Sequence, residues 1–156
     1  KKITEGQGPL QADVALKILA GLFGVGRVIK MRLQDMQVLL PDELLVDTPF
    51  GICLFPSDLV LDGQVSDDFD WYRASTPDQR KVQDIPSHEL KNVMKVIVGE
   101  SFSISKEDLA NAVLEVLSYK RKTKDTVGFM LEVVEWACEQ NYLSEENGLI
   151  RLKSDA

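Results

Sequence analysis

Nucleophilic and metal chemistry would have to use very few side chains in this chain. The sequence contains one histidine, His88, and two widely separated cysteines, Cys53 and Cys138. A Ser-His-Asp triad, a Cys-His dyad and a histidine-containing metal site would all depend on His88. Because Ser87 is a typical helix N-cap residue, we expect His88 to be exposed in the first turn of a helix. The cysteines have apolar neighbours, so we expect two buried, reduced thiols.

Two acid pairs and a glycine-rich segment are the other patterns that could do chemistry. Asp67-Asp68 and Glu145-Glu146 would suit general acid–base catalysis only if burial separated their pKa values. Both pairs have polar neighbours, so we expect solvated positions. Residues 21–26 contain three glycines but lack the Gly-Lys-Ser/Thr ending of a phosphate loop, and we interpret them as a helix end and turn. We therefore predict no catalytic residue, no metal and no cofactor, ATP included.

Basic residues that could contact phosphate are the remaining candidates. A net charge of −7 and a pI near 4.8 count against a broadly basic surface. Positive charge is nevertheless concentrated beside two predicted helix–turn–helix segments. The predicted nucleic-acid-binding residues are Arg27, Lys30 and Arg32 in the first segment, and Lys120, Arg121, Lys122 and Lys124 in the second. Four cations in the second segment predict a log–log salt slope of about −3 to −4 for binding. The open alternative is that Arg27 and Arg121 pack over their turns and pair with nearby acids.

These basic segments belong to a pattern that occurs twice along the chain. Each copy has a helical run, a basic turn, a second helix and two extended segments around a glycine. The second copy also has an introductory helix over 88–98 and a short strand over 101–104. In its final segments, Asn147-Gly148 is typical of a tight β-hairpin. The order helix, strand, helix, turn, helix, hairpin is that of a winged helix.

The predicted fold class is mainly α with small β-hairpins (α+β), as two tandem winged-helix-like lobes. The first lobe covers 1–57, and its introductory helix would precede Lys1, so we expect a piece of a longer protein. An acidic linker over 58–84, held at one point by Trp71 and Tyr72, leads to the second lobe over 85–156. We expect Trp136 to be buried in the second lobe.

Three short motifs resemble a known family. They are Glu5-Gly6-Gln7-Gly8-Pro9-Leu10, Gly24-Val25-Gly26-Arg27 and Ile85-Pro86-Ser87-His88-Glu89-Leu90. With the repeat, they resemble the uncharacterised C-terminal domain of large bacterial superfamily I DNA/RNA helicases, which often also carry a very-short-patch-repair-type nuclease domain. The resemblance covers nearly the whole chain, although Tyr119-Lys120-Arg121 stands where that family has a glycine-bearing turn. It implies an accessory module of a helicase whose motor lies elsewhere.

Two functions therefore remain open. The first is a non-catalytic accessory domain of a helicase that binds DNA weakly, because the last helix of a winged helix enters the major groove and its hairpin contacts the backbone. The second is a docking scaffold for other domains of the same protein. The longest uncharged apolar run, 18–25, is shorter than the roughly 20 residues of a membrane span, and no signal peptide is recognisable. We expect a cytoplasmic protein without a membrane partner.

Overall fold

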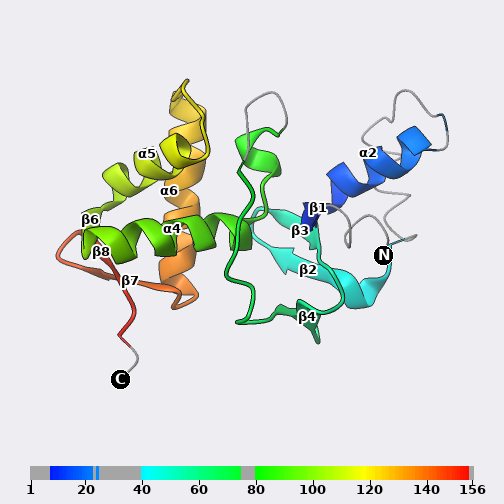
Figure 1. The fold of residues 1–156 in the computed structure, drawn as a ribbon, viewed down its shortest axis with the longest axis horizontal. Helices are drawn as coiled ribbons and strands as arrows, with labels where there is room; N and C mark the ends of the chain where they lie inside the picture. The colour runs from blue at the N-terminus through cyan, green and yellow to red at the C-terminus, as the bar shows by residue number, and fades with distance from the viewer. Residues whose placement is uncertain (1–7, 23, 25–39, 75–79, 155–156) are drawn as a thin grey trace. The chain divides into compact units, whose positions relative to one another are not determined.

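Four α-helices and several short antiparallel sheets make up the described part of this chain, so its fold class is α+β. The structure is a computed structural model that describes residues 8–22, 24, 40–74 and 80–154. The chain divides into two compact units, one ending at Phe69 and one beginning at Asp70. Figure 1 shows the elements of each unit. No helix among the described residues is long and apolar enough to cross a membrane.

The described part of the first unit contains one α-helix, a 3-10 helix, a three-stranded sheet and a two-stranded sheet. Its elements are β1 (Leu10–Gln11), α2 (Ala12–Leu22), a 3-10 helix (Asp42–Leu44), β2 (Leu45–Thr48), β3 (Gly51–Leu54), β4 (Val60–Leu61) and β5 (Gln64–Val65). The sheet has the order β1-β3-β2, so the predicted hairpin is confirmed and its second strand is central. On α2 the buried residues are Ala12, Ala15, Leu16 and Ala20. The predicted second helix and Arg27, Lys30 and Arg32 lie outside the described residues.

The structure divides residues 58–84, which the sequence analysis treats as one acidic linker. Strands β4 and β5 form a hairpin whose turn residues, Asp62 and Gly63, have φ of 51° and 74°, as a tight hairpin requires. Phe69 is buried in the first unit and meets Phe55 edge to face at 5.7 Å between ring centroids. Residues 58–69 therefore belong to the first unit, and residues 70–84 to the second.

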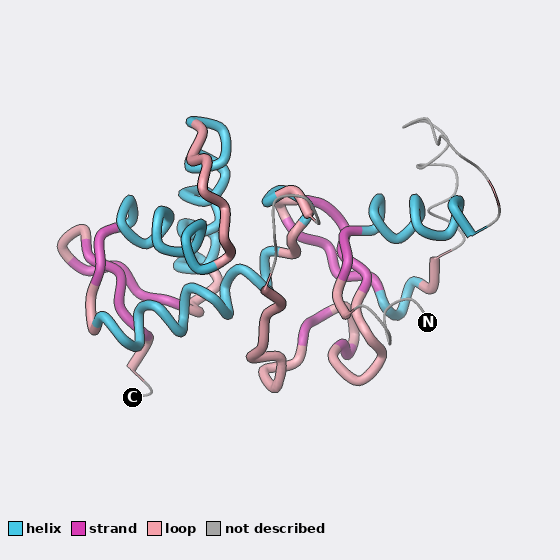
Figure 2. The backbone as a smooth tube through the Cα atoms, turned by 45° about the horizontal axis from the view of Figure 1, so that its top comes forward, coloured by secondary structure: helices cyan, strands magenta, loops and turns pink. Residues whose placement is uncertain are grey.

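Three helices pack with a second three-stranded sheet in the second unit (Figure 2). Its elements are a 3-10 helix (Val82–Asp84), α4 (Ser87–Ser101), β6 (Ile104–Ser105), α5 (Lys106–Val116), α6 (Lys124–Glu139), β7 (Leu143–Glu146) and β8 (Leu149–Leu152). The sheet order is β6-β8-β7, again with the last strand central. The predicted order of helix, strand, helix, helix and hairpin is thus present, but α4 runs to Ser101, so the strand lies at Ile104–Ser105 rather than over 101–104.

Helix caps and apolar spacing explain these elements. Ser105 Oγ accepts a hydrogen bond from the Asp108 amide at the start of α5, and Thr123 does the same for Thr126 at the start of α6; such caps satisfy amides that lack helical partners. The predicted apolar positions of α4 and α5 are buried, as is Trp136, which is 5% exposed. The turn residues Asn147 and Gly148 have φ of 53° and 76°, as expected for the predicted hairpin.

Candidate functional site

The basic turn, defined as residues 118–124, connects α5 to α6. Leu117 is the C-cap of α5, Ser118 follows it with a left-handed φ of 64°, and the Tyr119 amide donates to the Leu114 carbonyl oxygen. Thr123 then caps α6. The turn exposes all four predicted cations, Lys120, Arg121, Lys122 and Lys124. The second predicted set is therefore exposed within one short segment, and Lys120 and Lys122 of this set border the same hollow.

The cations of the basic turn differ in their pairing. Lys122 Nζ lies 2.6 Å from Glu115 Oε1, an ion pair that belongs to α5 and the turn. Within the described ranges, no ion pair engages Lys120, Arg121 or Lys124. The alternative that Arg121 pairs with an acid of its own unit therefore finds no support in these contacts. Three positive charges stay available to an external anion.

A hollow of about 530 Å³ lies beside the basic turn. It is lined by Glu115, Ser118, Tyr119, Lys120 and Lys122. Lysine ammonium groups and a serine hydroxyl can donate hydrogen bonds to phosphate oxygens. The Glu115 carboxylate, in contrast, repels an anion and competes for Lys122.

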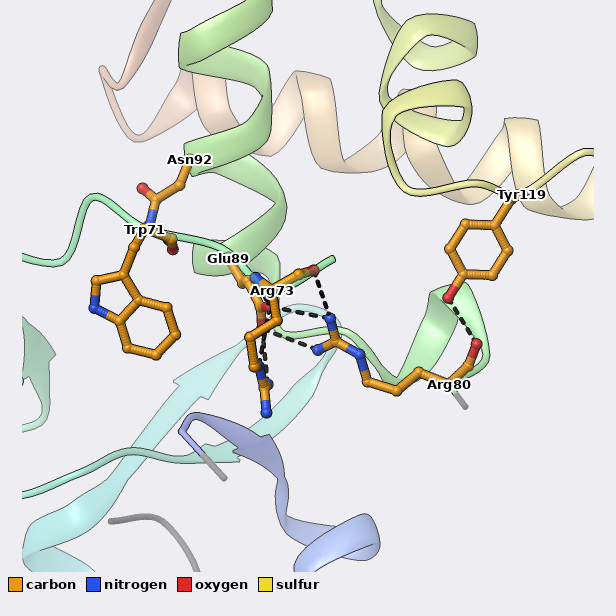
Figure 3. Close-up of polar contacts among 6 residues, drawn as sticks. All are labelled: Trp71, Arg73, Arg80, Glu89, Asn92 and Tyr119. Atoms are coloured by element: carbon orange, nitrogen blue, oxygen red, sulfur yellow. Dashed lines mark hydrogen bonds and ion pairs between the residues drawn. The ribbon is translucent and has the colours of Figure 1, made fainter. Parts of the chain in front are cut away.

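A buried carboxylate, Glu89, contacts two arginines, Arg73 and Arg80, and we call these three residues the arginine clasp. Figure 3 shows them together with Tyr119 of the basic turn. The Glu89 side chain is 1% exposed and forms ion pairs with Arg73 at 2.9 Å and Arg80 at 3.1 Å. The Arg73 amide also donates to Glu89 Oε1 at 2.8 Å. A buried carboxylate needs such partners, because an unpaired buried charge is strongly unfavourable.

The clasp sets the protonation state of Glu89. Burial by itself would raise the pKa of this carboxyl, but hydrogen bonds from Arg73 and Arg80 and their positive charges lower the pKa below its usual value. Glu89 is therefore ionised at neutral pH. This state keeps both guanidinium groups in place.

Tyr119 connects the arginine clasp to the basic turn. Its hydroxyl donates a 2.6 Å hydrogen bond to the Arg80 carbonyl oxygen, and Lys120 follows directly in the chain. On the other side, Asn92 Nδ2 donates to the Trp71 carbonyl oxygen at 2.9 Å. Figure 3 shows both contacts flanking Glu89. The clasp thus holds Tyr119, the second residue of the basic turn.

Sequence reasoning missed this clasp. Arg73, Arg80 and Glu89 counted only as charges of an acidic linker and the next helix. In this segment the Trp71 carbonyl accepts a hydrogen bond from Asn92, and the amide and side chain of Arg73 both donate to Glu89. The one available signal is that two arginines precede a glutamate in the first turn of a helix. This order in the sequence does not specify that the arginines contact the glutamate.

The expectation for Ser87 and His88 is wrong. Pro86 occupies the N-cap of α4, and its carbonyl accepts the Glu89 and Leu90 amides. His88 is 6% exposed and meets Trp136 edge to face, with 5.0 Å between ring centroids. The physical reason is burial of the first turn of α4 among aromatic side chains.

Burial also changes the acid–base properties of His88. Loss of hydration, and secondarily the charge of Lys91, lower the pKa of His88 to about 4. Lys91 itself stands over the Tyr142 ring, with 4.5 Å from Nζ to the centroid, a favourable cation–π arrangement. His88 is therefore a neutral core residue at physiological pH.

The exposed face of α6 is negative, and we call it the acidic stripe. Asp125, Glu132 and Glu139 repeat every seven residues, and Glu135 lies on the same face; residues at this spacing share one side of a helix. All four are exposed. The acidic stripe begins where the basic turn ends.

Lys106 at the start of α5 and Arg151 in β8 are paired with glutamates. Lys106 Nζ lies 3.0 Å from Glu145 and 3.6 Å from Glu135, and Arg151 pairs with Glu146 at 3.1 Å. Glu145 and Glu146 are exposed, as predicted. The hairpin therefore adds no excess positive charge beside α6.

The thiols offer no reactive pair. No disulfide joins Cys53 and Cys138; Cys53 is buried, and Cys138 is partly exposed, so the prediction of burial holds fully only for Cys53. Burial, with the charge of Glu145, raises the pKa of the Cys138 thiol. Within residues 8–22, 24, 40–74 and 80–154, no three His, Cys, Asp or Glu side chains form a group suited to a metal ion.

Comparisons with known proteins add no relative to this description. The chain matches no family of known proteins, no curated protein and no solved structure.

Proposed function

We propose that this chain is a non-catalytic accessory module of a helicase-type nucleic-acid-processing protein, and that it contacts nucleic acid through the basic turn. The exposed, unpaired cations of that turn carry this proposal. The resemblance of the sequence to the C-terminal domain of bacterial superfamily I helicases favours a helicase of that kind as the parent protein. The lack of a disulfide between Cys53 and Cys138 agrees with a cytoplasmic location.

The second unit is proposed to be a winged helix. Its element order and its sheet with a central last strand support this architecture. In the first unit, β1, α2, β2 and β3 follow the same order with the same central strand, which supports a tandem arrangement. In this proposal α6 takes the place of the recognition helix and β7–β8 that of the wing.

The acidic stripe limits how such a winged helix meets nucleic acid. A recognition helix in the major groove lies between two phosphate backbones, where Glu132 and Glu139 would be repelled. The basic turn, in contrast, presents Lys120, Arg121 and Lys124 at the end of the helix. Binding is therefore proposed to use phosphate contacts at the turn, without reading of bases.

Salt titration of a labelled oligonucleotide tests this function. Because Lys122 is paired with Glu115, three cations rather than four are available, and the expected log–log salt slope is about −2 to −3. We expect K120A/R121A/K124A to lose most binding. The matched control K17A/K95A/K153A removes the same charge from exposed positions elsewhere and is expected to retain most of the affinity. Equal binding by the two triple variants would contradict the proposal.

An exposed apolar surface favours docking as a second candidate function. Phe102 is 86% exposed, and Val96 and Leu152 are also exposed. Val96 and Leu152 border a hollow of about 250 Å³ together with Asp70, Asn92 and Lys95. Apolar patches of this kind often serve protein contacts. If association with other domains of the parent helicase persists at high salt and is lost in V96S/L152S, docking replaces nucleic-acid binding as the function.

A further inference from the structure

The charges of the second unit separate into a short attractive surface and a longer repulsive one. Attraction is confined to the basic turn, residues 118–124, whereas the acidic stripe runs along the whole exposed face of α6. At 1.5 Å of rise per residue, Glu132 lies about 10 Å and Glu139 about 21 Å beyond Asp125 along the helix axis. The two surfaces therefore act on different parts of an extended ligand.

Screening decides which ligand geometry each surface affects. At physiological ionic strength the Debye length is about 8 Å. A phosphate bound at Lys120 or Arg121 is consequently shielded from Glu139, while a phosphate lying beside the middle of α6 is not. Repulsion thus depends on whether the ligand follows α6 or crosses its end.

A duplex and a single strand differ in this respect. A rigid duplex that contacts the basic turn with one backbone carries neighbouring phosphates, on both strands, toward α6. A flexible single strand can cross the turn, place a few phosphates on Lys120, Arg121 and Lys124, and continue away from the acidic stripe. The hairpin does not offset this repulsion for a duplex, because its Arg151 is paired with Glu146 and the neighbouring Lys106 of α5 is paired with Glu145.

From this arrangement we infer that the basic turn binds single-stranded nucleic acid in preference to duplex, and that the acidic stripe produces the preference. This inference rests on the proposed function and adds the class of nucleic acid. Glu115 tunes the same site, because its ion pair with Lys122 occupies one cation that a strand would otherwise contact.

Fluorescence anisotropy of the full chain with a labelled twelve-nucleotide oligothymidylate and a duplex of the same length tests the inference. We expect the single strand to bind about fivefold more tightly than the duplex at low salt, the size expected from several screened acid–phosphate repulsions. The variant E132Q/E139Q should raise duplex affinity about threefold and leave single-strand affinity unchanged. The control E43Q/E100Q makes the same change in net charge at exposed positions outside α6 and should leave the ratio of the two affinities unchanged.

The possible outcomes separate this inference from the proposed function. Duplex binding as tight as single-strand binding, with both lost in K120A/R121A/K124A, overturns the inference and retains the function. An affinity ratio that is the same in E132Q/E139Q and E43Q/E100Q also overturns the inference, because the preference then has another origin. Absence of binding to either probe at low salt overturns both.

Discussion

Charged side chains cluster near the N-termini of both α4 and α6, but the two clusters differ in burial and pairing. At α4, Glu89 is buried and its charge is matched by Arg73 and Arg80. At α6, Lys120, Arg121 and Lys124 are exposed, and no ion pair engages them among the described residues. Internal pairing makes the first cluster structural, whereas exposure leaves the second free for an external anion. The Tyr119 hydroxyl, which donates to the Arg80 carbonyl, links the structural cluster to the proposed binding cluster.

Glu89→Gln should cause the largest change. The substitution leaves two guanidinium groups without their carboxylate, and we expect a loss of about 3 kcal/mol in the free energy of unfolding, at the low end for buried pairs because Arg73 and Arg80 are partly exposed. Urea denaturation of the full chain measures this loss. Glu107→Gln, at an exposed position of α5, is the control. Equal effects of the two variants would show that the clasp does not stabilise the fold.

Acid should destabilise the start of α4 next most strongly. The folded chain holds the pKa of His88 at about 4, whereas the unfolded chain protonates it near pH 6.5. The unfolded state therefore binds more protons between these values, and lowering the pH from 6.5 to 4 should reduce stability by up to about 3 kcal/mol. Glu89, with its lowered pKa, loses its contribution only as the pH falls through its own folded pKa. Urea titrations between pH 7 and 4.5 should show this slope in the wild type and a flatter one in H88F.

Tyr119→Phe should have a moderate effect that reaches both clusters. Loss of the hydrogen bond to the Arg80 carbonyl should reduce the free energy of unfolding by about 1 kcal/mol. The substitution should also weaken oligonucleotide binding, because Tyr119 is part of the basic turn and directly precedes Lys120. The control is Y72F, since the Tyr72 hydroxyl forms no hydrogen bond with a described residue. Weakened stability with unchanged binding would separate the clasp from the turn.

Lys122→Ala should have the smallest effect on stability. Its ion pair with Glu115 is on the surface, so we expect a change in the free energy of unfolding within about 0.5 kcal/mol. The partner substitution Glu115→Gln frees Lys122 and should steepen the salt slope by about 0.7 for a single strand. An unchanged slope would mean that Lys122 does not reach the ligand.

The sequence predicted the elements whose signals are local. Asn147-Gly148 identified the β7–β8 hairpin, and apolar spacing identified α4, α5 and α6. Asp62-Gly63 carried the same kind of turn signal for β4–β5 and was overlooked, because strands of two residues have no visible alternation. The basic turn was predicted because its four cations lie within five residues of the sequence. The ion pair between Lys122 and Glu115 was not predicted, since Glu115 lies in α5, on the other side of the helix end.

Contacts between distant parts of the chain escaped prediction for a physical reason. The Arg73–Glu89 bond joins residues 16 positions apart, and burial of His88 depends on Trp136 and Tyr142 far downstream. A local pattern describes which face of a helix is apolar, but it does not specify what covers the first turn. His88 was therefore predicted to be exposed, because Ser87 alone was taken as the sign of a helix start.

The arginine clasp also defines where an autonomously folding fragment can begin. A fragment starting at Ile85, where the sequence pattern begins, contains Glu89 but neither Arg73 nor Arg80. One starting at Asp70 contains all three, together with the Trp71 carbonyl that Asn92 contacts. Trp71, Arg73 and Arg80 thus supply contacts to α4 from the chain ahead of it, and we expect a synthetic peptide of residues 70–84 to complement the shorter fragment in trans.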